Sequence, residues 1–181
     1  GTGDYLATEV SNDFALGTND FTFEMWVYYE SRSTGDTPAV LDSTTTTYAP
    51  LIGYIENAAA TNGHAVVYIS ANGSSWGIAS AKTFGFINEK QWYHLAISRV
   101  TGSPYSTTRC FVNGNLDQTS TTYQQSPAIS GFNEWIIGSP SPNNIGNAYN
   151  EVTGYMQDVR FTEGLGRYTA NFTPPTASLE G

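Results

Sequence analysis

Hydrophobic and polar residues alternate with a period of two in two long segments of this chain, a pattern typical of β-strands that bury one face. A strand with one apolar face lies against a large core, and a tryptophan on its other face indicates that this face is partly covered too. The segment Phe21 to Glu30 is therefore predicted to be a central strand. It has an apolar face of Phe21, Phe23, Met25, Val27 and Tyr29 and a mixed face of Thr22, Glu24, Trp26 and Tyr28.

The segment from Gln91 to Asn115 is predicted to form two strands joined by a loop. The first strand alternates from Trp92 to Arg99, a break follows at Gly102-Ser103-Pro104, and the second strand ends at Asn113-Gly114. Asn-Gly favours a type I′ turn, because both central residues of that turn need a positive φ. We therefore expect a tight hairpin at Asn113-Gly114.

The remaining strands are predicted from short apolar runs bounded by turn residues. A loop is expected from Asn57 to Gly63 and a short helical turn from Gly164 to Tyr168, but the pattern contains no amphipathic helix of three turns. The fold class is therefore all-β, a two-sheet antiparallel β-sandwich. These further strands are Tyr5–Ala7, Ala39–Leu41, Leu51–Ile55, His64–Ser70, Phe84–Ile87, Glu134–Gly138 and Gly154–Phe161.

Composition limits the organisation and the partners of the protein. With 181 residues, we expect one domain over residues 1–175, followed by a C-terminal tail or expression remnant at 176–181. The net charge of −9 and the seven Lys and Arg residues disfavour nucleic acid and anionic membranes as partners. Cys110 is the single cysteine and lies in a predicted strand, so we expect a buried, inert thiol and no intrachain disulfide.

Several short motifs resemble one known family when they are taken together. In chain order they are FTFEMW, WYHLA, FVNG, IIG and GYMQDVRF, and they resemble the strands of laminin-G-like domains, which have the concanavalin A-like jelly-roll fold. The ending GYMQDVRFTEGLGRYTANFTPP is similar to the C-terminal signature of such domains in tailed-phage virion proteins. The resemblance implies a tail-fibre or capsid-appended protein, located on the virion surface or outside the cell.

The C-terminal residues are expected to serve the structure. Val159 and Phe161 should face the core, while Asp158 and Arg160 face outward and form a surface pair. Arg167 and Tyr168 are expected to tie the tail back onto the sheet. Pro174-Pro175 would stiffen the exit of the chain towards a neighbouring domain.

Catalysis is not expected from the carboxylates. A retaining glycosidase needs two carboxyl groups roughly 5 Å apart, and glycosidases of this fold carry them close together on one strand. Glu24, Glu134 and Asp158 each stand alone on their strands. The protein is therefore predicted not to be an enzyme.

No cofactor is expected, with calcium as the alternative. His64 and His94 have no third ligand beside them, which argues against zinc. The resemblance implies a rim calcium held by an aspartate at the position where this chain has His64, and that difference argues against the site. The loops nevertheless carry oxygen ligands for calcium at Asp36, Asp42, Asn143, Asn144 and Glu151.

Sugar recognition is the binding chemistry that the loops favour, because proteins stack aromatic rings on pyranose rings and place amides beside them. The predicted ligand-binding residues are Tyr149, Asn143, Asn144 and Tyr54, centred on the loop from Ser139 to Asn150. The alternative is that the tyrosines only cap the edges of the sandwich. Other aromatic residues expected outside the core are Tyr48, Trp76, Tyr105 and Tyr123, with Trp76 in a packing role.

These observations predict a non-catalytic attachment module that recognises glycans on a cell surface or in the environment. The alternative is a structural decoration or spacer domain in an oligomeric virion assembly, with no sugar ligand. The expected partners are a glycan, other virion domains and further copies of the chain, and they include neither nucleic acid nor a membrane.

Overall fold

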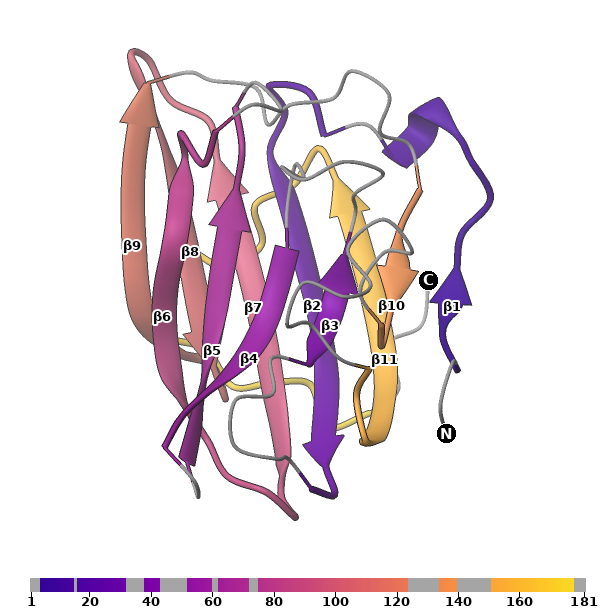
Figure 1. Cartoon of the computed structure of the whole chain (residues 1–181). Coiled ribbons are helices and arrows are strands. Elements are labelled where there is room, and N and C mark those ends of the chain that lie inside the picture. Colours follow the sequence, from indigo (N-terminus) through magenta and orange to yellow (C-terminus); the bar gives the residue numbers. More distant parts are fainter. Residues whose placement is uncertain are drawn as a thin grey trace.

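A computed structural model of the chain describes residues 4–14, 16–31, 38–42, 52–59, 62–71, 75–123, 134–139 and 151–177. For residues 12, 52, 54–59, 62, 81, 122 and 123 it describes the backbone alone. Two antiparallel sheets face each other, which confirms the predicted β-sandwich (Figure 1). Among the described residues, the helical structure is a short 3-10 turn, Asn12–Phe14, and no helix has the length and hydrophobicity needed to span a membrane.

Sheet A has six strands in the order β1-β10-β3-β4-β5-β6. The short strands β1 and β10 extend the sheet beyond β3, and Leu6 of β1 lies opposite Ile137 of β10. The bounds are β1 Leu6–Ala7, β10 Ile136–Ile137, β3 Ala39–Asp42, β4 Ile52–Ala59, β5 Asn62–Ile69 and β6 Ala79–Ile87.

Sheet B has five strands in the order β11-β2-β7-β8-β9. Strand β2 lies between β11 and β7, as expected for a central strand, and Trp26 lies opposite His94 of β7 and Gln157 of β11. The bounds are β11 Gly154–Glu163, β2 Phe21–Tyr29, β7 Trp92–Val100, β8 Tyr105–Val112 and β9 Asn115–Tyr123.

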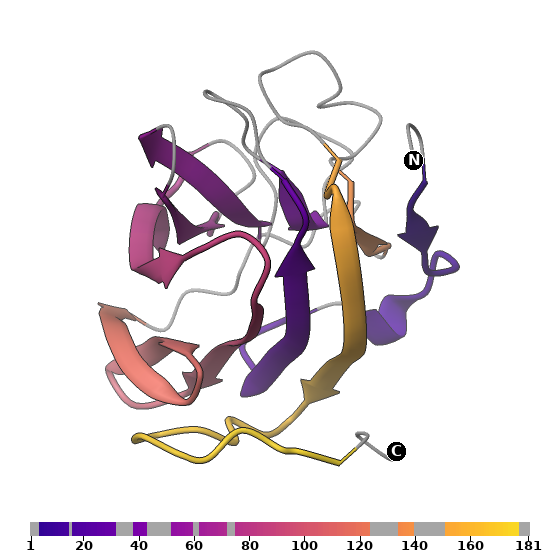
Figure 2. The same ribbon diagram turned by 90° about the horizontal axis from the view of Figure 1, so that it is seen from below.

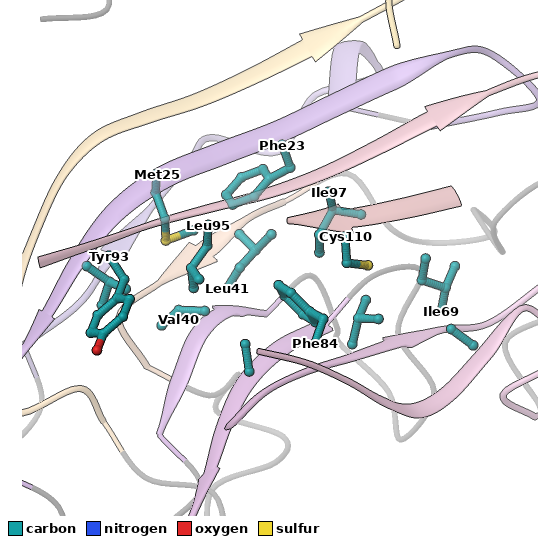
Figure 3. Packing of buried hydrophobic residues seen from close by; sticks show 14 of the residues in the cluster. Phe23, Met25, Val40, Leu41, Ile69, Phe84, Tyr93, Leu95, Ile97 and Cys110 are labelled. Atoms are coloured by element: carbon teal, nitrogen blue, oxygen red, sulfur yellow. The ribbon is translucent and has the colours of Figure 1, made fainter. Parts of the chain in front are cut away.

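The core lies between the two sheets and consists of packed aliphatic and aromatic side chains (Figure 3). A cavity of about 20 Å³ remains there, which is room for a single water molecule and too small for a ligand. Cys110 is 2% exposed, and its burial raises the pKa of the thiol, so the predicted burial is confirmed. Sheet B contributes Phe23, Met25, Tyr93, Leu95, Ile97 and Cys110, and sheet A contributes Val40, Leu41, Ile69 and Phe84.

The hairpin between β8 and β9 has the predicted turn. Asn113 has a φ of 50° and Gly114 a φ of 74°, the two positive values that a type I′ turn requires. The Asn113 side-chain oxygen also accepts a hydrogen bond of 2.9 Å from the backbone N–H of His94. The turn is thus joined to β7 as well as to its own strands.

Two of the predicted connections differ from the structure. Strands β4 and β5 continue to Ala59 and from Asn62, so the loop expected from Asn57 to Gly63 is much shorter. No helical turn forms at Gly164 to Tyr168. There the backbone N–H groups of Arg167 and Tyr168 donate to side-chain hydroxyls on sheet B, at 2.8 and 3.2 Å, which competes with helix formation.

A C-terminal segment forms a third layer. Residues 164–177, called the strap below, cross the outer face of sheet B (yellow in Figure 2). The strap is joined to β2 where Arg167 donates to the Thr22 hydroxyl, and to β7 where Tyr168 donates to the Ser98 hydroxyl. The prediction that Arg167 and Tyr168 tie the tail to the sheet is confirmed.

Candidate functional site

A buried polar cluster lies between sheet B and the strap, centred on Glu24. One carboxylate oxygen, Oε1, accepts hydrogen bonds from Nε and Nη2 of Arg160 at 3.0 and 2.7 Å. The other, Oε2, accepts one from the Tyr168 hydroxyl at 2.7 Å and lies 3.2 Å from Nε2 of His94. Glu24 and His94 are both fully buried.

Hydrogen bonding determines the charge of Glu24. Burial by itself would raise the pKa of this carboxyl, but hydrogen bonds from His94, Arg160 and Tyr168 outweigh it and lower the pKa to about 2. Burial and the bond to Glu24 in turn raise the pKa of Tyr168 to about 12. Glu24 is therefore a stable anion whose lone pairs are occupied, and it holds the strap by a charge-assisted hydrogen bond.

The polar cluster around Glu24 corrects the prediction for Arg160 and adds a role to the one predicted for His94. Arg160 was expected to pair with Asp158 at the surface, whereas both of its bonding nitrogens contact the buried Glu24. His94 is a packing residue as predicted, since it contacts the rings of Trp26 and Phe172, but it is also part of this polar cluster.

A β-bulge in β11 decides which side chains reach the outer face. Gln157 lies opposite Trp26 and Arg160 lies opposite Glu24, so one extra residue occurs in β11 between two pairs. Asp158, at the bulge, has a φ of 52°, which Asp and Asn tolerate better than other side chains. Strict alternation would have placed Gln157 and Arg160 on opposite faces of the sheet.

Beyond the strap, three aromatic rings form a row across sheet B. Tyr28 of β2 lies opposite Tyr155 of β11 on one side and Trp92 of β7 on the other. The centroid distances from the Tyr28 ring are 5.8 Å to Tyr155 and 5.5 Å to Trp92. Tyr155 is 64% and Trp92 39% exposed, so the row presents ring surface to the solvent.

A groove of about 270 Å³ lies beside this row. Its volume is near the lower end of the range for small-ligand pockets, roughly 300–1,000 Å³. The strap provides one wall, so the groove depends on how the strap is docked. We call it the aromatic groove; the described residues that line it are Trp26, Trp92, Gln157, Asp158, Pro175 and Thr176.

The polar groups at the groove suit hydroxyl recognition. Gln157 is exposed and carries both donors and an acceptor, while the carboxylate of Asp158 accepts hydrogen bonds. Partial burial and the neighbouring Glu30 carboxylate raise the pKa of Tyr28, so its hydroxyl keeps its proton. The surface thus combines ring faces with neutral and acidic hydrogen-bonding groups.

Most of the predicted ligand-binding residues lie outside the described residues. Tyr149, Asn143 and Asn144 belong to that part, and their proposed role stays a prediction. Tyr54 is described by its backbone alone, in β4 opposite Val66. The structure therefore does not bring these four residues together or separate them.

The other candidate aromatic residues have mixed outcomes. Trp76 packs on Tyr68, with ring centroids 5.1 Å apart, which confirms its packing role. Tyr105 is 44% exposed, as expected for a residue outside the core. Tyr123 is described by its backbone alone, and Tyr48 lies outside the described residues.

The aromatic groove is a site that the sequence interpretation missed. Alternation already placed Trp26 and Tyr28 on the outer face of their strand, and the same rule placed Trp92 on one face of its own. The hydrophobic pattern does not show that β2 pairs with β7 and β11, because the register between two distant strands cannot be predicted from the sequence of either strand alone.

The described residues near the predicted rim loop form a second depression. It has a volume of about 320 Å³, and Gly138 and Val152, which flank residues 140–150, contribute to it together with Tyr5. The other described residues that line it are mainly aliphatic, such as Leu6, Ile137 and Met156. This depression therefore offers fewer aromatic ring faces than the aromatic groove.

Metal ligands are dispersed in the described part of the chain. Within those residues, no group of three or more His, Cys, Asp and Glu side chains could hold a metal ion. Of the calcium candidates, Asp42 is buried in β3 and Glu151 is described, whereas Asp36, Asn143 and Asn144 lie outside the described residues. The calcium alternative thus stays a prediction.

Comparison with known proteins assigns most of the chain to one superfamily. A profile of the concanavalin A-like lectin/glucanases superfamily matches residues 1–164, so the match ends where the strap begins. No curated protein sequence matches the chain significantly.

Solved structures with low sequence identity share the fold. The heptameric SAP-like pentraxin from Limulus polyphemus aligns with a TM-score of 0.59 at 13% identity, over 87% of this chain and 68% of the pentraxin. The CBM40 of the Ruminococcus gnavus IT-sialidase, bound to α2,3 sialyllactose, has a TM-score of 0.54 at 13% identity, over 89% of this chain and 90% of that one. A candidate carbohydrate-binding protein from Bacteroides ovatus has a TM-score of 0.55 at 15% identity, over 87% of this chain but 40% of that protein.

Proposed function

Because the chain belongs to the concanavalin A-like lectin/glucanases superfamily, we propose that it is a non-catalytic carbohydrate-binding module and that the aromatic groove is its binding surface. The observation that carries the proposal is the exposed row of Tyr155, Tyr28 and Trp92, which runs into a groove lined by Gln157 and Asp158.

The physical argument starts from the two sides of a sugar ring. A pyranose has faces of C–H groups and an edge of hydroxyls, so it is bound by an aromatic surface with hydrogen-bonding groups beside it. Trp26 and Trp92 supply the rings, and the amide of Gln157 and the carboxylate of Asp158 supply the polar atoms. Because Tyr28 is held between two rings, the surface is also pre-organised, which lowers the entropy lost on binding.

Two of the structural neighbours agree with this proposal, one by its bound sugar and one as a candidate carbohydrate binder. The Ruminococcus gnavus module binds sialyllactose, and the Bacteroides ovatus protein is a candidate carbohydrate binder. The shared fold alone does not transfer a ligand, so these neighbours support the class of function while the groove supports its location.

The absence of catalysis is part of the proposal and rests on Glu24. This carboxylate is fully buried under the strap, and its pKa of about 2 makes it a weak proton acceptor at neutral pH. A screen of β-glucans and alginate should give no turnover. Turnover that is lost in a Glu24→Gln variant would contradict this part of the proposal.

We further propose that the module belongs to a phage virion or a similar exposed assembly, where it attaches to glycans on a cell surface or in the environment. The support is the resemblance of the segment GYMQDVRFTEGLGRYTANFTPP to virion domains of this family. Sequencing the full-length parent gene and its neighbours tests the setting, since a cluster without virion genes would contradict it.

The binding proposal is tested with Trp92→Ala on a glycan array, followed by calorimetry on the strongest ligand. Removing this ring, which lines the groove, should weaken binding at least tenfold, the size typical of an aromatic residue that is important at an interface. Phe86→Ala is the matched control, because Phe86 is 70% exposed on sheet A and does not line the groove.

Two other results would redirect the proposal. Binding that is lost in Tyr149→Ala but kept in Trp92→Ala would place the site in the rim loop predicted from the sequence. An array without any binding, together with a stable trimer in light scattering, would favour the structural decoration or spacer domain.

A further inference from the structure

The three rings of the aromatic row lie on three neighbouring strands of sheet B, so the row runs across the strands. Tyr28 of β2 lies directly opposite Tyr155 of β11 and Trp92 of β7. The Tyr28 ring centroid is 5.8 Å from that of Tyr155 and 5.5 Å from that of Trp92, a spacing that follows from the separation of neighbouring strands, roughly 4.8 Å. Each step along the row is thus similar to the length of one pyranose residue in an extended glycan chain.

The three rings do not share one plane. The planes of Tyr28 and Trp92 meet at 52°, and those of Tyr28 and Tyr155 meet at 56°. A single sugar ring can therefore lie flat on only one of these aromatic surfaces. A glycan chain can contact all three, because its successive residues are rotated relative to each other about the glycosidic bonds. The row thus offers separate contacts to successive sugar residues.

Both ends of the row are open among the described strands. Strand β11 is at the edge of sheet B, so no described strand continues the sheet beyond the exposed ring of Tyr155. On the other side, β8 ends at Val112, which lies opposite Leu95, so β8 does not reach the level of Trp92. No described strand therefore blocks a chain that continues past either end of the row.

We infer that the aromatic groove binds an internal trisaccharide segment of a glycan chain, rather than a monosaccharide or the terminal residue of a glycan. The chain lies across the strands of sheet B, with one sugar residue on each ring of the row. The strap residues Pro175 and Thr176 lie along one side of it, as a wall of the groove. The inference rests on the proposed function and names the ligand class of the same site.

The length of the bound segment is tested by calorimetry with sugars from the monosaccharide to the hexasaccharide. The probes are cello-, laminari- and xylo-oligosaccharides, together with the corresponding series of any polysaccharide that binds on the glycan array. In a series that binds, the affinity should rise at least tenfold from the monosaccharide to the trisaccharide. It should rise only a few-fold from the tetrasaccharide to the hexasaccharide, because a longer chain adds binding registers but no further ring contact.

Variants of Tyr155 test whether the third ring contributes to binding. Tyr155→Ala should reduce the affinity for the trisaccharide to about that for the disaccharide, while Tyr155→Phe, which keeps the ring, should bind the trisaccharide within a few-fold of the parent. Tyr105→Ala is the matched control, because Tyr105 is another exposed tyrosine of sheet B and lies on β8, outside the row. This variant should leave the whole series unchanged.

The position of the segment along the glycan is tested with the parent polysaccharide, separated into fractions of different chain length. Binding to an internal segment predicts that the number of protein molecules bound per chain rises with chain length. Recognition of a chain end instead keeps that number constant.

The outcomes separate this inference from the proposed function. Suppose that Trp92→Ala abolishes binding, but the monosaccharide binds as tightly as the trisaccharide, Tyr155→Ala keeps the trisaccharide affinity of the parent, or the number bound per chain stays constant. In each of these cases the groove binds sugar but the inference is wrong. If no glycan binds, or if Trp92→Ala leaves binding unchanged, the proposed function and the inference both fail.

Discussion

At the scale of single residues, Glu24 shows how a charge can be buried in this sandwich. Its four hydrogen-bonding contacts come from Arg160, Tyr168 and His94, which lie on three different segments of the chain. A buried carboxylate is tolerated when its lone pairs are occupied and a cation is present, and both conditions are met here. Glu24 thus joins β2, β7, β11 and the strap at one point.

This arrangement predicts a specific acid sensitivity. The folded-state pKa of about 2 lies below the usual value of 4.5, so the stabilisation is complete above about pH 4.5 and is lost as the pH falls towards 2. The shift corresponds to roughly 3 kcal/mol. Glu24→Gln should lower the free energy of unfolding at pH 7 by about that amount and flatten its dependence on acid, as measured by urea denaturation at several pH values.

The matched control for Glu24→Gln is Glu9→Gln, because Glu9 is exposed. This variant should change stability by less than about 0.5 kcal/mol. A Glu24→Gln protein that keeps the acid dependence of the parent would show that Glu24 does not hold the strap.

At the scale of elements, the β8–β9 hairpin and the strap depend on each other. The Phe172 backbone N–H donates to the carbonyl of Gly114 at 2.9 Å, and a Cβ atom at Gly114 would overlap the Phe172 carbonyl oxygen. Gly114 is therefore required twice, by its φ of 74° and by the close approach of the strap.

A pair of alanine variants separates these two requirements. Gly164 also has a positive φ, 77°, but a Cβ there meets nothing within 4 Å, so Gly164→Ala should cost about 1 kcal/mol from backbone strain alone. Gly114→Ala should cost roughly 2 kcal/mol more, because the strap must also move. Equal losses in urea denaturation of the two variants would contradict the close contact.

At the scale of the whole molecule, the protein has three layers. The strap is the outermost layer, and its last residues also line the aromatic groove. Phe172 stacks on Tyr168 at a centroid distance of 3.6 Å, and both rings pack on Phe111 of β8. The strap then continues to Pro175 and Thr176, which line the aromatic groove. Docking of the strap and ligand binding should therefore be thermodynamically linked.

Phe172→Ala tests this link. Loss of the stacked ring should release the strap, which would speed tryptic cleavage after Arg167 and weaken glycan binding at the groove several-fold. The unfolding free energy should fall by about 2 kcal/mol, less than for a fully buried phenylalanine. Phe86→Ala serves as the control for both assays. Faster cleavage without any loss of binding would show that the strap is not a functional wall.

The sequence by itself determined the layers of this protein. Alternation in Phe21 to Glu30 and in Trp92 to Arg99 identified the strands and their apolar faces, and Asn113-Gly114 identified a turn, because periodicity and turn chemistry are local properties. The family motifs, and the attachment of the tail to the sheet through Arg167 and Tyr168, could also be predicted from the sequence. The predicted role of the rim residue Tyr149 stays a prediction.

The tertiary structure decided which outward-facing residues meet. Tyr28, Trp92 and Tyr155 are neighbours because β2 pairs with both β7 and β11, and a bulge at Asp158 brings Gln157 and Arg160 to the same face. The burial of Glu24 likewise depends on a strap that is separated from it by more than a hundred residues. Such contacts follow from register and long-range packing, which a local pattern of hydrophobic and polar positions does not encode.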